Sequence, residues 1–199
     1  MSEVKTNKVS PVGANGTVTL GDSGDTITIP SGATIANSGT ATGFGSDNSA
    51  AFQALLSTNQ QVTDNTRTKV QCTTESFDTD SAYDNSTNYR FTVPAGKGGK
   101  YYVYGQIWFF STHGGNDLIE QRVDITKNGS TQIAGARNHR NSMGVYETVN
   151  CSIIADLSAG DYIEMFGTFN NAQAGSYPHF QASSTGEGTL FGAYKMIGI

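Results

Sequence analysis

The stretch Tyr101–Phe110, YYVYGQIWFF, decides the fold that we expect for this chain. Aromatic or apolar side chains occupy both of its alternating faces, whereas a strand with one face in water would alternate with polar residues. We therefore expect a strand that is covered on both sides. One cover would be the core of a β-sandwich. The other would be a neighbouring subunit, because Tyr and Trp are enriched where an interface is packed yet partly wet.

The sequence around this stretch predicts an all-β sandwich. From Ser46 onward, strand-like runs recur about every ten residues and turn formers separate them. We expect strands at residues 51–62, 66–73, 89–93, 101–111, 119–127, 131–137, 146–155, 162–169 and 189–197. The run 50–60 also has helical propensity, so a helix is the alternative there.

Composition agrees with β-structure and excludes some functions. The chain of 199 residues has 24 glycines and only 15% charged residues, and its formal charge is -5. This balance predicts no basic face on which a nucleic-acid backbone would settle, so we expect no nucleic-acid partner. No apolar run is long enough to cross a bilayer, and the N-terminus has no apolar secretion signal. We expect a soluble protein that is made in a cytosol, without membrane insertion.

The segment before residue 46 contains one aromatic residue, Phe44, and carries a short repeat. The run TVTL at residues 17–20 is echoed by TITI at 26–29 and by ATI at 33–35. Each run alternates apolar residues with Thr, which is the pattern of a half-buried strand. Turn-forming residues stand between the runs, at Gly21–Asp25 and at Pro30–Gly32.

A segment with one thin apolar stripe cannot fold alone, since chains below about 40 residues usually need a disulfide, a metal or oligomerisation. We therefore predict a trimeric β-stem over residues 13–45, in which three stripes face one axis. Its inward side chains would be Val18, Leu20, Ile27, Ile29 and Ile35. The alternative is a disordered tail rich in Gly, Ser and Thr.

Four motifs in the rest of the chain resemble the C1q/TNF-like jelly rolls, which assemble as trimers. They are FTVPAG at 91–96 followed by GKYYV at 99–103, VDITKNG at 123–129, LSAGDYI at 157–163, and LFG at 190–192. Val103 stands where the family has an aromatic residue, and the turn before it is longer. The resemblance covers most of residues 50–199.

This resemblance implies two five-stranded sheets. The inner sheet would face the threefold axis with the first, the last and the aromatic-rich strands. The implied trimer interface consists of Tyr102, Tyr104, Trp108, Phe110 and Tyr194. It also implies that the strands of Cys72 and Cys151 lie at opposite edges of one sheet. We expect two free thiols, with a single disulfide as the alternative.

The N-terminal segment, from about Lys5 to Phe44, is similar to the stems of structural proteins of marine bacteriophages. The sequence TLGDSGDTITIPSGATI at residues 19–35 carries the similarity. It implies a virion protein, made in the host cytoplasm, with an attachment arm at 1–12 that binds other virion proteins, a stem at 13–45 and a head at 46–199. The predicted function is a homotrimeric fibre, spike or capsid-decoration protein. A host receptor-binding tail-fibre tip and a non-viral secreted or cell-surface C1q-like module are the alternatives.

One basic cluster, at residues 137–141, offers a candidate contact with host surface polysaccharide. Arg side chains have fork-shaped donors that suit carboxylates, phosphates and sugar hydroxyls. The candidate ligand residues are Arg137, His139, Arg140, Tyr177 and His179. A polar loop that only faces water is the alternative.

No arrangement in the sequence predicts an enzyme. The run GDSG at residues 21–24 is typical of a serine-protease nucleophile loop, but every histidine lies in the head, far along the chain. We expect no cofactor. Asp78, Asp80 and Asp84 lie close together and carry oxygen ligands of the kind that Ca²⁺ takes. Tyr83 stands where a calcium-binding EF-hand loop would need Gly, so a solvated acidic loop is our preferred interpretation.

Overall fold

The computed structural model describes residues 9–11, 13, 16–36, 38, 49–111, 118–143, 145–171, 178–182 and 187–197, and for 140–143 it describes the backbone alone. The chain divides into two compact units, Met1–Phe44 and Gly45–Ile199. No helix long and apolar enough to cross a membrane is found in the described residues.

All strands of the described chain belong to the second unit, which is the head. They are β1 (Ala51–Leu55), β2 (Gln60–Gln61), β3 (Thr68–Lys69), β4 (Thr74–Asp78), β5 (Tyr83–Asp84), β6 (Arg90–Thr92), β7 (Gly99–Phe110), β8 (Leu118–Lys127), β9 (Thr131–Met143), β10 (Tyr146–Leu157), β11 (Tyr162–Asn171), β12 (His179–Phe180) and β13 (Leu190–Lys195).

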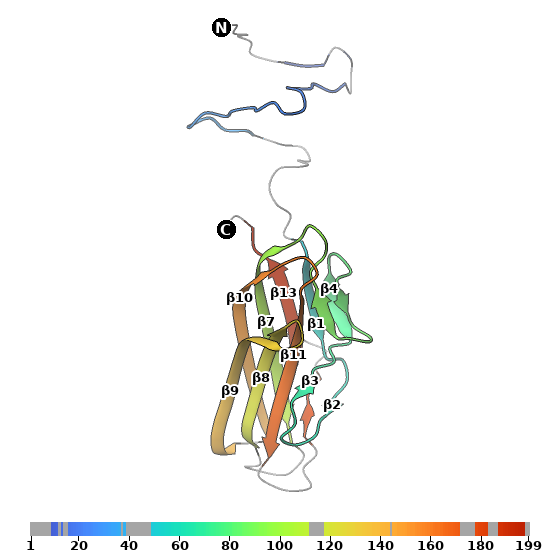
Figure 1. The fold of residues 1–199 in the computed structure, drawn as a ribbon, viewed down its shortest axis with the longest axis vertical. Coiled ribbons are helices and arrows are strands. Elements are labelled where there is room, and N and C mark those ends of the chain that lie inside the picture. Colours follow the sequence, from blue (N-terminus) through green and yellow to red (C-terminus); the bar gives the residue numbers. More distant parts are fainter. Residues whose placement is uncertain are drawn as a thin grey trace. The chain divides into compact units, whose positions relative to one another are not determined.

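These strands form two antiparallel sheets that face each other (Figure 1). Sheet A contains the path β4-β1-β13-β7-β10, and the short strands β12 and β2 extend it beside the far end of β7. Sheet B has the order β5-β6-β11-β8-β9, and the short strand β3 also pairs with β11. The resemblance implied five strands in each sheet, and the structure has seven in sheet A and six in sheet B.

The core lies between the sheets and is rich in aromatic side chains. From Tyr101 to Phe110 of β7 the odd-numbered residues are buried and the even-numbered ones half-buried, as a strand of period two requires. The largest core aromatics are fully or almost fully buried: Phe52, Phe91, Tyr101, Phe109, Phe169, Phe180 and Phe191. Burial of a side chain of this kind stabilises the fold by roughly 1.5–3 kcal/mol.

One glycine in β11 is required by this packing. A Cβ atom at Gly167 would lie 2.4 Å from Cζ of Phe180 and 2.8 Å from Cδ1 of Ile107. Real Cβ atoms do not approach other atoms this closely, so a larger residue would push the Phe180 ring out of the core. Gly167 thus lets β12 of sheet A cover β11 of sheet B.

The predicted strands of the head have counterparts in the structure, with two kinds of difference. The run 51–62 is interrupted, because β1 ends at Leu55 and β2 begins at Gln60. Three strands were not predicted, namely β4, β5 and β12. Strand β4 has the sequence TESFD and is exposed over four of its five residues, so it lacks the apolar alternation that identifies a half-buried strand.

The described residues of the first unit form the predicted turns but not the predicted strands. The N–H of Asp25 donates to the carbonyl of Asp22 over 3.0 Å, and the N–H of Ala33 donates to the carbonyl of Pro30 over 3.0 Å. Gly21, at φ 78°, has the left-handed backbone that a turn requires. No strand is formed over residues 16–36 in the single chain, and the strands predicted at 17–20, 26–29 and 33–35 belong to a trimeric stem that the single chain does not contain. A strand needs a hydrogen-bonded neighbour, and one copy of this segment does not supply it.

Candidate assembly face and candidate ligand site

The outer side of sheet A carries two clusters of aromatic side chains, one on each side of Gln106, which together we call the aromatic face. Its members are Tyr102, Tyr104, Trp108, Phe110, Tyr146, His179 and Tyr194. The even-numbered residues of β7 point away from the core, and the register places Tyr194 of β13 opposite Tyr102 and Tyr146 of β10 opposite Phe110. All five residues predicted for the trimer interface lie on this face.

Tyrosines make up one end of the aromatic face. The ring centre of Tyr102 lies 5.4 Å from that of Tyr194 and 5.9 Å from that of Tyr104. The Tyr104 ring lies over Gly192, where a Cβ atom would be 2.4 Å from the ring, and its hydroxyl donates to Oε1 of Gln53 over 2.9 Å. Burial, with smaller contributions from Tyr194 and Tyr102, raises the pKa of Tyr104, so the hydroxyl stays a neutral donor.

A mixed aromatic cluster makes up the other end. The Tyr146 ring lies 5.5 Å from Trp108 and 4.5 Å from Phe110, and Phe110 also packs on His179 at 4.6 Å. Several of these side chains remain open to solvent in the single chain: Tyr146 is 50% exposed and Tyr194 39%. Tyr146 was not predicted for this face, because its place opposite Phe110 depends on the pairing of β10 with β7.

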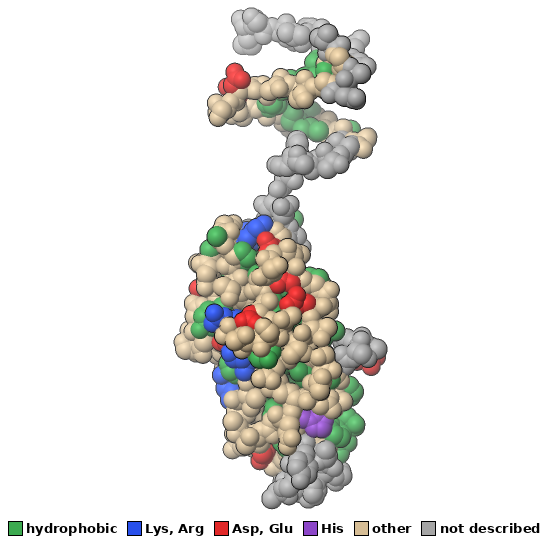
Figure 2. All heavy atoms as spheres, turned by 90° about the vertical axis from the view of Figure 1, so that its right-hand side faces the viewer, with side chains coloured by type: hydrophobic (Ala, Val, Ile, Leu, Met, Phe, Trp, Pro, Cys, Tyr) green, Lys and Arg blue, Asp and Glu red, His purple; other side chains and the backbone are tan. Residues whose placement is uncertain are grey.

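The outer side of sheet B has a different character and is called here the basic face. It consists of Arg67, Lys69, Arg90, Arg122 and Arg137, together with the rings of Tyr162 and Phe166. The Arg67 guanidinium lies 3.6 Å from the centre of the Phe166 ring, and Arg90 lies 4.2 Å from that of Tyr162. Figure 2 shows Lys and Arg side chains along one side of the head and hydrophobic side chains along the other.

The carboxylates of the basic face lie beneath its cations. Asp124, whose side chain is 1% exposed, accepts from Nε of Arg67 at 3.2 Å and from Nε of Arg122 at 2.7 Å. Glu164 is likewise buried and pairs with Lys69. The paired cations remain 33% to 40% exposed. Positive charge therefore faces the solvent, and negative charge supports it from below.

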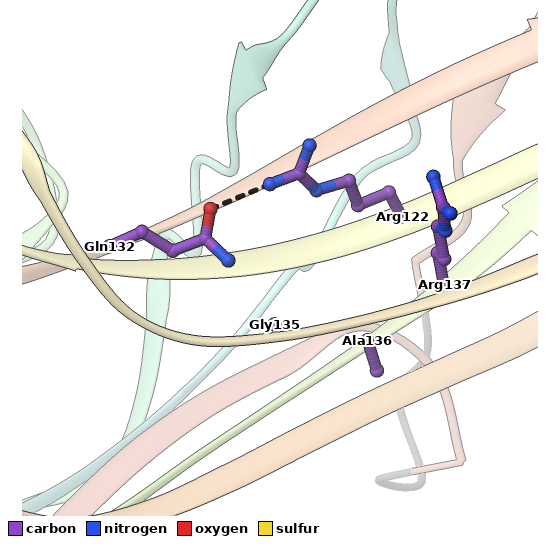
Figure 3. Close-up of a pocket in the computed structure, with 5 residues that line it drawn as sticks. All are labelled: Arg122, Gln132, Gly135, Ala136 and Arg137. Carbon is purple, nitrogen blue, oxygen red and sulfur yellow. Dashed lines mark hydrogen bonds between the residues drawn. The ribbon is translucent and has the colours of Figure 1, made fainter.

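An open pocket of about 330 Å³ lies on this face, lined by Arg122, Gln132, Gly135, Ala136 and Arg137 (Figure 3). Nη2 of Arg122 donates to Oε1 of Gln132 over 2.6 Å. A Cβ atom at Gly135 would lie 2.6 Å from Nε2 of Gln132 and 3.0 Å from Oδ1 of Asp124. The missing side chain of Gly135 thus leaves room for both groups.

The structure separates the candidate ligand residues of the sequence analysis. Arg137 and His139 lie on the exposed side of β9 in sheet B, whereas His179 belongs to β12 on the aromatic face of sheet A. The side chain of Arg140 and the whole of Tyr177 lie outside the described residues. Arg67, Lys69, Arg90 and Arg122 were not predicted, because they come from three separate parts of the chain that meet only through the pairing of β3, β6 and β8 with β11.

The carboxylates of the acidic loop at residues 78–84 accept hydrogen bonds from nearby backbone N–H groups. Oδ2 of Asp78 accepts from the N–H of Tyr83 over 2.7 Å, and Oδ1 of Asp84 accepts from the N–H of Thr87 over 2.8 Å. Backbone N–H groups of Thr87 and Ser86 hold the pKa of Asp84 well below its ordinary value. These carboxylates cap turns, and the described residues contain no group of three His, Cys, Asp or Glu that would hold a metal.

Both cysteines are free thiols, as we expected. Cys72 is buried beside β4 at one edge of sheet A, and Cys151 lies in β10 at the other edge. Burial, with a smaller effect of Asp124, raises the pKa of Cys151 to about 12. A thiol with such a pKa is a poor nucleophile at neutral pH.

Comparison with solved structures defines the class of the head. Two antiparallel sheets in this order form a C1q/TNF-like jelly-roll β-sandwich. One similar structure is the globular domain of zebrafish complement 1qA protein, with a TM-score of 0.51, 14% identity and coverage of 74% of this chain and 97% of that chain. Another is murine APRIL, with a TM-score of 0.50, 13% identity and coverage of 73% and 98%. No protein-family model and no curated protein matches the sequence.

Proposed function

We propose that this chain is a homotrimer-forming display protein whose aromatic face is the subunit interface. The observation that carries the proposal is the group of half-exposed rings on sheet A, which includes Trp108, Tyr146 and Tyr194. Soluble monomers rarely leave large contiguous apolar patches in water, and aromatic residues are enriched at interfaces. Packing against neighbouring copies would remove these rings from water.

The resemblance to trimeric jelly rolls supports three copies, and so does the first unit. Its five apolar side chains, predicted for the core of the stem, are between 40% and 66% exposed in the single chain. A stripe of this kind gains burial only from other copies. Three copies of residues 13–45 around one axis would bury the stripe and give each strand a neighbour.

The further proposal is that the trimer is a structural virion protein of a bacteriophage: a fibre, a spike or a capsid decoration. The similarity of the first unit to phage stems supports it. In this account residues 1–12 bind other virion proteins and the head is displayed for contact with the host surface. A receptor-binding tail-fibre tip and a non-viral C1q-like module are the competing functions. Imaging of the virion with a tagged chain tests the proposal, and absence of the tag from the particle would refute it.

A matched pair of variants tests the interface. Tyr102→Glu places a charge within the aromatic face, whereas Thr168→Glu places the same charge on the outer side of sheet B, opposite Arg122 in the register. We expect Tyr102→Glu to be a folded monomer in light scattering and Thr168→Glu to keep the wild-type mass. A Tyr102→Glu protein with the mass of the trimer and unchanged thermal stability would refute the assigned interface.

A further inference from the structure

The distribution of arginine in the head is uneven. The chain has five arginines and a formal charge of -5. Arg67, Arg90, Arg122 and Arg137 all lie on the outer side of sheet B. With Lys69 they give five cations on the basic face, against the four carboxylates of Asp84, Glu120, Asp124 and Glu164, so the face has a net charge of five minus four, or about +1. The expectation of no basic face, which was drawn from composition alone, was therefore wrong, because sheet pairing gathers cations from distant parts of an acidic chain on one slightly positive surface.

The guanidinium groups next to the pocket are held in place before any ligand arrives. Nε of Arg122 is fixed by Asp124 at 2.7 Å, and its Nη2 is fixed by Gln132 at 2.6 Å (Figure 3). Arg67 is fixed by Asp124 and by the Phe166 ring. Donors that are already ordered lose less conformational entropy on binding. Arginines that served only to keep the protein soluble would not require these fixed contacts.

Arg137 is the less constrained of the two arginines in the pocket. Its side chain is 69% exposed, and its nearest carboxylate oxygen, on Glu120, is 3.8 Å away. At that distance and exposure the pair contributes little to stability. Arg137 is therefore free to turn toward a bound anion, while Arg122 on the neighbouring strand stays fixed.

The pocket volume of about 330 Å³ is near the lower end of the range of small-molecule sites, roughly 300–1,000 Å³. Planar guanidinium groups bind carboxylates and sulfates through paired hydrogen bonds. The pocket is open along a sheet surface, where Arg67 and Lys69 continue the positive charge. This arrangement suits a chain of repeated anionic groups better than one small anion.

We propose that the basic face binds an acidic polysaccharide. In this proposal the guanidinium groups of Arg122 and Arg137 both donate to one carboxylate or sulfate group over Gly135. This inference deepens the proposed contact with a host surface and rests on it for its biological setting. Of the ligand residues predicted from sequence it keeps only Arg137, and it adds Arg122 of β8, with Arg67 and Lys69 beside the pocket.

Calorimetry with the full-length protein and polymers of defined length tests the site. We expect binding of alginate, which carries carboxylates, or of dextran sulfate, with affinity that falls as salt rises, and no binding of neutral dextran. Binding of alginate alone would assign the group as a carboxylate, and binding of dextran sulfate alone as a sulfate. Failure to bind either polymer would overturn the proposal. Tighter binding of single-stranded DNA would overturn the assignment to polysaccharide.

Two variants with equal charge loss separate a site from general attraction. Arg137→Gln should weaken binding about tenfold, the effect of losing one charge-assisted hydrogen bond. Lys100→Gln, whose exposed ammonium pairs with Asp156 in sheet A, should bind like the wild type. Equal weakening in both variants would refute the site. Light scattering on the same samples keeps the two proposals apart, because a monomer that binds the polymer would refute the trimer and not this site.

Discussion

At the residue scale, carboxylates organise the outer side of sheet B and the turns beside it. Asp124 orients two guanidinium groups from beneath. Asp161 joins a turn to a hairpin, because it accepts from Nζ of Lys127 at 2.7 Å, from Nδ2 of Asn128 at 2.8 Å and from the N–H of Ser158 at 2.7 Å. One side chain thus connects the loop before β11 to the end of β8.

Asp161→Asn should lower the stability of the head at neutral pH and flatten its acid dependence. Lys127, Asn128 and Ser158 hold the pKa of Asp161 at about 2, below its ordinary value of 3.8. Because the folded pKa is the lower one, the carboxylate stabilises the fold above about pH 4, and this stabilisation is lost as the pH falls toward roughly 2.

Denaturant midpoints measured across this pH window check the prediction. The gap between wild type and Asp161→Asn should close as the medium becomes acidic. Asp156→Asn is the control, since its side chain is 78% exposed and an exposed ion pair contributes little. A gap that stays constant with pH would show that Asp161 acts through its shape and not through its charge.

At the element scale, the periodicity of the sequence predicts individual strands. It does not predict which side chains become neighbours when strands pair. Strand β7 was predictable because both of its faces are apolar. The place of Tyr146 beside Phe110 depends on the pairing of β10 with β7, over a distance in sequence that no local pattern reports. The basic face was missed for the same reason, since Arg67 and Arg122 meet only through Asp124.

The stem remains a prediction that one chain cannot test, and substitutions in its stripe address it. Ile27→Asp or Ile29→Asp should weaken the trimer while the head keeps its thermal transition. In the proposed trimer each substitution removes an apolar side chain that would be buried, a contribution of roughly 1.5–3 kcal/mol. The loss occurs in three copies at the same height along the stem. Each substitution also brings three carboxylates together, which desolvation and like charge disfavour.

Thr28→Asp is the matched control for the stem, because Thr28 alternates with the two isoleucines and would face outward. We expect it to leave the mass of the trimer unchanged in light scattering. Equal effects of Ile27→Asp and Thr28→Asp would contradict an inward-facing stripe. The segment would then be a flexible tether.

At the scale of the whole head, the two outer faces of one sandwich have opposite chemical character. Sheet A presents rings that water solvates poorly, and sheet B presents cations that water solvates well. In the proposed trimer the first face is covered and the second stays open. Three copies of the basic face would then engage one polymer together, which raises avidity without any new contact.

The most direct test of the central claim is the mass of the full-length chain in solution. Light scattering at micromolar concentration should give three times the chain mass of 21.0 kDa, because the aromatic face and the apolar stripe both lack cover in one copy. A stable monomer at that concentration would contradict the account, since it would show that Trp108, Tyr146 and Tyr194 need no partner.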